Sequence, residues 1–98
     1  RLELTPVRLA HQWQWYDDRL VIFSDANFNV RRFDLNLVGG LVWEFSDGTL
    51  SGEGIVDELA QVYPDVSLEQ LRQYVCAFLG QLEEEWLLTS KEALAAYE

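Results

Sequence analysis

Residues 35–48 read Leu-Asn-Leu-Val-Gly-Gly-Leu-Val-Trp-Glu-Phe-Ser-Asp-Gly, and this stretch decides the fold of the chain. Its apolar residues recur at the three- and four-residue spacing of a helix with one buried face. Asn36 is a suitable N-cap, and Asp47-Gly48 provides a stop, because glycine readily takes the left-handed conformation that ends a helix. The pair Gly39-Gly40 weakens this helix by roughly 1 kcal/mol per glycine relative to alanine. Such a pair is tolerable where it permits close packing against a neighbour.

The residues before this stretch have the patterns of β-strands. Alternation of apolar and mostly polar residues predicts a first strand over residues 7–15, and a short apolar run predicts a second over residues 20–23. Asp17-Asp18 supplies the turn between them, and residues 24–27 supply a second turn. A third strand would occupy residues 29–35. Short connections favour antiparallel neighbours, so the sequence predicts a three-stranded meander.

Two further helices are predicted after residue 48. Ser51 can cap a helix with one apolar stripe, which Pro64 ends. Ser67 and Gln70 fit a capping box at the start of the third helix. The apolar face of the third helix repeats over three turns, at Leu71, Tyr74, Val75, Phe78, Leu79 and Leu82. We expect the glutamates at 83–85 to fray, residues 86–88 to pack back on the core, and residues 89–98 to form a mobile tail.

Length and composition place further bounds on the protein. The chain has 98 residues, four tryptophans and a formal net charge of −10. This length suits a single domain over residues 1–98, with one modest core over residues 7–88. The order of elements is α+β, a three-stranded antiparallel sheet followed by three helices. The acidity disfavours nucleic acid and anionic membranes as partners. No apolar run approaches the roughly 20 residues of a membrane span, and the lone Cys76 suits a reducing cytoplasm.

The order and spacing of these residues resemble those of the PqqD-like peptide chaperones, also called RiPP recognition elements. The resemblance covers roughly residues 7–88. Family members commonly show Leu-Asn, a small residue, an apolar pair, Asp-Gly, a serine or threonine, an Ile-Val pair and later leucines. In this chain those places are held by Leu35-Asn36, Gly39, Leu41-Val42, Asp47-Gly48, Ser51, Ile55-Val56, Leu59, Phe78-Leu79 and Leu82. The chain departs from the family at Gly54, which is often acidic there, at Glu85-Trp86, where glycine is frequent, and in the connection over residues 24–28.

The resemblance implies a winged-helix-turn-helix-like fold and a non-catalytic function. Members bind the leader peptide of a ribosomally synthesised precursor and deliver it to a modifying enzyme, often a radical SAM protein. The leader is implied to add as a strand to the edge of the third strand, in a groove beside the third helix. Carried over here, the peptide-binding residues would be Asn29, Val30, Arg31, Arg32, Phe33 and Asp34 on the strand, and Arg72, Val75, Cys76 and Leu79 on the helix.

Several alternatives stay open on the sequence. Arg31 and Arg32 lie on opposite faces of a strand, so at most one faces the groove, and both can instead protect an edge from aggregation. A winged-helix DNA-binding regulator would share the topology, although the second and third helices offer only Arg72 as a cation. A structural subunit of a partner enzyme is a further alternative, and an exposed edge can also pair with a second copy of the chain.

Catalytic and metal sites are not expected from the sequence. His11 has no second histidine or cysteine cluster with which to bind a metal. Cys76 is expected to be a small buried or groove-lining residue, because no basic neighbour is assured for it. No convergent nucleophile and base can be written down, and no cofactor is expected.

Overall fold

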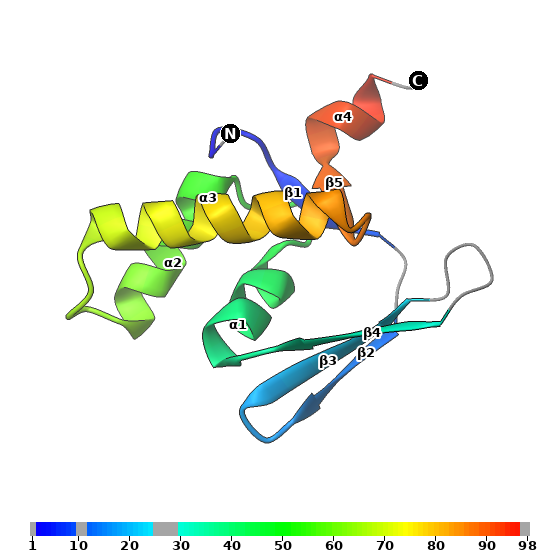
Figure 1. The fold of residues 1–98 in the computed structure, drawn as a ribbon. Coiled ribbons are helices and arrows are strands. Elements are labelled where there is room, and N and C mark those ends of the chain that lie inside the picture. The colour runs from blue at the N-terminus through cyan, green and yellow to red at the C-terminus, as the bar shows by residue number, and fades with distance from the viewer. Residues whose placement is uncertain (1, 10–11, 25–29, 97–98) are drawn as a thin grey trace.

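The larger sheet of the protein is the predicted meander (Figure 1). The computed structural model describes residues 2–9, 12–24 and 30–96. Strands β2 (Gln12–Tyr16), β3 (Arg19–Ser24) and β4 (Arg31–Leu35) pair antiparallel in the order β2-β3-β4. Asp17 in the two-residue turn between β2 and β3 has a φ of 57°, a left-handed conformation that aspartate tolerates better than most residues. The three-stranded antiparallel sheet and the α+β class are therefore confirmed.

A second, two-stranded sheet corrects two sequence expectations. Strand β1 (Pro6–Arg8) pairs antiparallel with β5 (Leu88–Ser90). The single strand predicted over residues 7–15 is therefore two strands in different sheets, because the first part pairs with a segment near the other end of the chain. The tail predicted over residues 89–98 instead contains most of β5 and a helix, α4 (Lys91–Ala95). The side chain of Ser90 caps α4 by accepting a hydrogen bond from the backbone N–H of Ala93.

Three longer helices begin at the N-caps that the sequence predicts. They are α1 (Leu37–Phe45), α2 (Gly52–Val62) and α3 (Leu68–Glu84). Asn36, Ser51 and Ser67 each accept a hydrogen bond from the backbone N–H three residues later. Gly48 follows α1 with a φ of 87°, which places glycine where a left-handed residue is required. None of the helices in the described ranges is long and apolar enough to cross a membrane.

The C-terminal end of α3 is a defined motif, where the sequence suggested fraying. The N–H of Leu87 donates to the carbonyl of Leu82 at 2.9 Å, and the N–H of Trp86 donates to that of Glu83 at 3.1 Å. This pair of bonds is the Schellman motif, and the buried Leu82 and Leu87 provide the apolar contact that accompanies it. Trp86 has a φ of 60° and occupies the position that glycine usually takes.

Helix α1 lies between the sheet and α3, and the glycine pair makes this possible (Figure 1). A Cβ atom on Gly40 would lie 2.3 Å from Cη2 of Trp15 on β2, and one on Gly39 would lie 2.9 Å from Cζ of Phe78 on α3. The close packing expected at the pair is confirmed. One core cluster joins the sheet to α1 and the end of α3, through Leu20, Ile22, Leu35, Trp43, Leu82, Leu87 and Leu88. A second joins the helices, through Val42, Ile55, Val56, Leu59, Leu71 and Val75.

Candidate functional site

The outer edge of β4 is the candidate for strand addition. β4 pairs with β3 on one side, and within the part of the chain that the structure describes no strand pairs with its other side. An unpaired edge presents backbone N–H and C=O groups that another extended chain can bind. Val30, immediately before β4, is highly exposed. Asn29, the first residue of the edge predicted from the sequence, lies outside the described residues.

One face of β4 turns toward the core and toward α3. Leu35 is buried, and Phe33 is partly buried against the cluster beneath the sheet. Arg31 shares this face, since side chains alternate along a strand. Its guanidinium carbon lies 4.7 Å from the centroid of the Phe33 ring, and the guanidinium forms an ion pair with Glu85 at the end of α3. Arg31 therefore connects the β4 edge to α3.

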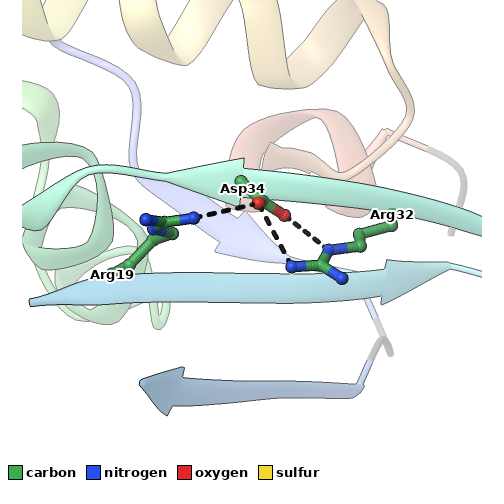
Figure 2. Close-up of polar contacts among 3 residues, drawn as sticks. All are labelled: Arg19, Arg32 and Asp34. Atoms are coloured by element: carbon green, nitrogen blue, oxygen red, sulfur yellow. Dashed lines mark hydrogen bonds and ion pairs between the residues drawn. The ribbon is translucent and has the colours of Figure 1, made fainter. Parts of the chain in front are cut away.

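The other face of β4 carries a second arginine, which is engaged within the sheet (Figure 2). Nε and Nη2 of Arg32 donate to the two carboxylate oxygens of Asp34 at 2.8 and 3.3 Å, and Nη1 of Arg19 on β3 lies 3.6 Å from Oδ2 of Asp34. The hydrogen bond from Arg32 holds the pKa of the Asp34 carboxyl below its usual range, and the charges of Arg32 and Arg19 act in the same direction. The same bond raises the pKa of Arg32. Arg31 is thus the arginine that faces α3, in keeping with the alternation of side chains along the strand.

The flank of α3 nearest β4 carries aromatic residues. Tyr74, Phe78 and Glu85 follow the spacing i, i+4 and i+11, which places them on one side of the helix. The rings of Tyr74 and Phe78 stack with centroids 5.7 Å apart and planes 10° from parallel. Burial raises the pKa of the Tyr74 phenol. We call Tyr74, Phe78 and Glu85 the β4-side flank of α3; it was not predicted from the sequence, although the aromatic pair four residues apart could have indicated it.

Arg72 and Cys76 lie on the opposite flank of α3. Nε of Arg72 is 3.3 Å from Oε2 of Glu53 on α2. Cys76 borders a small cavity of about 30 Å³ between α3, β5 and the N-terminal segment, whose lining includes Leu2 and Leu4. Their predicted position facing β4 is therefore corrected. The reason is that both flanks of α3 have the same helical spacing on either side of the buried stripe, so the periodicity alone could not select one.

The remaining two helix residues of the predicted site differ in position. Val75 is fully buried in the cluster between the helices. Leu79 is partly buried, packs against both clusters and lines the same small cavity as Cys76. Phe33 and Leu79 therefore pack against the same core cluster, and Arg31 lies over the Phe33 ring, whereas Arg72 contacts α2 and Cys76 borders the cavity beside β5.

No metal centre is built by the described residues. Among residues 2–9, 12–24 and 30–96 there is no group of three or more histidine, cysteine, aspartate or glutamate side chains that could hold a metal ion. His11, the one histidine of the chain, lies outside these ranges.

Comparison with known proteins assigns the family. The family described as Coenzyme PQQ synthesis protein D (PqqD) matches residues 27–88, more than half of the chain. A solved structure described as "TbiB1 in Complex with the TbiA(beta) Leader Peptide" matches with a TM-score of 0.72 and 24% sequence identity, over 84% of this chain and 92% of that chain. At that identity the likeness shows a shared fold. No match to the curated proteins was found. By the family match, which runs from before β4 to the start of β5, this chain belongs to the PqqD family.

Proposed function

We propose that this chain recognises the leader peptide of a ribosomally synthesised precursor by strand addition at the β4 edge. The chain performs no catalysis itself and presents the precursor to a modifying enzyme, such as a radical SAM protein. The observation that carries the proposal is the unpaired β4 edge beside the β4-side flank of α3, in a chain of the PqqD family. The structure of TbiB1, which shares the fold, is described as a complex with a leader peptide, and this supports the proposal.

The β4 edge is a better receptor than the β2 edge, which also lacks a partner strand among the described residues. Specific strand addition needs backbone groups for affinity and side-chain contacts for selectivity. Phe33 on β4 and Phe78 on α3 are partly buried apolar side chains that pack against the same core cluster. The hollow beside β2 is lined by Gln12, Trp13, Gln14 and Phe23, whereas the β4 edge is joined to the long helix α3 through the ion pair between Arg31 and Glu85. Apolar leader side chains therefore find suitable contacts at β4.

The added strand is expected to run antiparallel to β4. Every strand pair in the described sheets is antiparallel, and antiparallel pairing is slightly more stable per residue. Alternate leader side chains then face α3 and the outer face of the sheet, where Arg32 and Asp34 lie. The leader's backbone supplies affinity, and the residues that face α3 supply selectivity.

A DNA-binding function is disfavoured by the helices themselves. Binding to a phosphate backbone relies on lysine and arginine side chains. Helices α2 and α3 together carry one cation, Arg72, and it pairs with Glu53. The chain as a whole has a formal net charge of −10. These charges would repel DNA from the helix that a winged-helix regulator inserts into the major groove.

A calorimetric titration tests the proposed function. The probe is the synthetic leader peptide of the precursor encoded beside this chain, with a scrambled peptide of the same composition as the control. We expect saturable 1:1 binding of the true leader alone. Leaders carrying a backbone N-methyl group at successive positions should lose affinity with a period of two, because alternate N–H groups face β4. Equal binding of the true and scrambled peptides would contradict specific recognition.

The oligomeric state provides a second check on the same edge. A second copy of the chain that paired at β4 would occupy the groups that the leader needs. Mass measurement in solution during the titration should therefore show any dimer dissociating as leader is added. A dimer that persists in the saturated complex would show that the chain self-associates through another surface.

A further inference from the structure

The two most exposed large apolar side chains of the described residues lie at one end of β4. Val30 is 79% exposed and Trp86 is 76% exposed. Val30 directly precedes Arg31, Trp86 directly follows Glu85, and the ion pair between Arg31 and Glu85 ties the two segments together. We call these four residues the Arg31 corner. It is continuous with the β4 edge to which the leader is proposed to bind.

Trp86 occupies a backbone position that disfavours it. Its φ of 60° lies in the left-handed region, and its place in the Schellman motif is normally held by glycine. A bulky residue with positive φ is a genuine outlier in proteins. Most of the Trp86 side chain is nevertheless exposed. Strained residues that persist on a surface are frequently found at ligand-binding sites, which motivates a binding role for this tryptophan.

Arg31 is held in position while some of its donors stay available. Its guanidinium lies over the Phe33 ring, and one of its terminal nitrogens contacts Glu85. A guanidinium has five N–H donors in a planar fork, so a further carboxylate can bind beside the first. The side chains of Arg31 and Glu85 are 43% and 45% exposed. Ion pairs at such positions are weak and exchange readily for another partner.

We propose that the Arg31 corner is a subsite for an acidic leader residue that lies next to an apolar or aromatic one. The leader carboxylate binds Arg31 in competition with Glu85, and the apolar side chain packs on Trp86 and Val30. This inference rests on the proposed function. Antiparallel addition places the C-terminal part of the bound leader segment here, because β4 begins at Arg31. The Arg31 corner thus contacts the leader residues that lie nearest to the part of the precursor that is modified.

The test is a set of titrations with the leader peptide of the precursor encoded beside this chain, labelled with fluorescein. Arg31→Gln should weaken binding by up to about fivefold, the range for an exposed charge pair. Glu85→Gln should tighten leader binding, because the carboxylate that competes for Arg31 is removed while the shape of the side chain is kept. Trp86→Gly should weaken binding by about fivefold or more, as truncated aromatic anchors do. Trp86→Asn, which also tolerates the left-handed conformation, serves as a second variant.

A matched control lies on the other flank of α3. Arg72 and Glu53 form an arginine–glutamate pair of similar exposure, 46% and 47%. Arg72→Gln and Glu53→Gln should leave leader affinity unchanged. A second peptide set, with each leader aspartate or glutamate replaced in turn by asparagine or glutamine, completes the design. For one of these peptides, the affinities for the wild type and for Arg31→Gln should be equal. The acid that is replaced in that peptide is the one that couples to Arg31.

The outcomes separate this inference from the function on which it rests. If the wild type binds the leader, but Arg31→Gln and both Trp86 variants bind it equally well, the corner is not a subsite and the proposed function stands. The corner is likewise not a subsite if no leader acid couples to Arg31. If the folded wild type binds no leader, the proposed function fails and the inference fails with it. Circular dichroism at the assay temperature confirms that each variant is folded.

Discussion

Replacement of Gly40 by alanine tests the packing that positions the sheet against α1. The new Cβ would lie 2.3 Å from Cη2 of Trp15, far inside van der Waals contact. Overpacking of this kind costs about 1–3 kcal/mol. Displacement of the Trp15 ring also weakens the 2.9 Å hydrogen bond from its Nε1 to Glu44, which is worth about 1 kcal/mol. The higher helix propensity of alanine returns about 1 kcal/mol. We therefore expect a net loss of about 1–3 kcal/mol in the free energy of unfolding.

Gly80 supplies the matched control for this prediction. It also lies inside a helix, α3, but a Cβ there would meet nothing within 4 Å. Gly80→Ala should therefore show the propensity gain alone, about 1 kcal/mol of stabilisation. Urea denaturation followed by tryptophan fluorescence measures both variants under the same conditions. Equal effects of the two substitutions would refute the packing explanation, because helix propensity would then account for both.

Further predictions concern the core and the sheet. Leu59→Ala on α2 truncates a residue that is 0% exposed and should lower the free energy of unfolding by about 2–5 kcal/mol. Val62 on the same helix is 51% exposed, so Val62→Ala should change it by less than about 0.5 kcal/mol. Similar losses for the two variants in urea denaturation would contradict the assigned core. The pKa of Asp34, read from its carboxyl carbon by NMR, should lie below its ordinary value of 3.8 because Arg32 donates to it. The interaction between Asp34 and Arg32 then stabilises the fold above pH 3.8. This contribution is lost as the pH falls through the lower pKa that Asp34 has in the folded state. Arg32→Gln should move that pKa back toward 3.8, and an unchanged value would show that the pair does not form in solution.

Local signals in the sequence predicted most of the elements. Asn36, Ser51 and Ser67 act as N-caps because a short polar side chain can satisfy the first free N–H groups of a helix. The two-residue turn at Asp17-Asp18 fixes neighbouring strands, so the meander follows from short connections. The glycine pair indicated a close approach, which the structure shows with Trp15 and Phe78.

Non-local features were beyond the sequence patterns. The pairing of β1 with β5 joins the two ends of the chain, and alternation in residues 7–15 carries no information on which sheet each part enters. The flank of α3 that faces β4 also escaped prediction, since Arg72 and Cys76 have the same spacing as Tyr74 and Phe78. The end of α3 was missed for a different reason. Its three glutamates suggested fraying, but the burial of Leu82 and Leu87 fixes a motif that has Trp86 in the place of glycine.

The most direct test of strand addition at β4 is backbone amide hydrogen exchange with and without the leader peptide, residue by residue. Strand addition predicts that alternate amides of residues 31–35 gain protection in the complex, because their outward N–H groups acquire partners. The amides of β2, at the other edge of the same sheet, should exchange at unchanged rates. Two results at saturating leader would contradict recognition by strand addition at β4. One is protection of the β2 amides with the β4 amides unchanged, and the other is protection of neither edge.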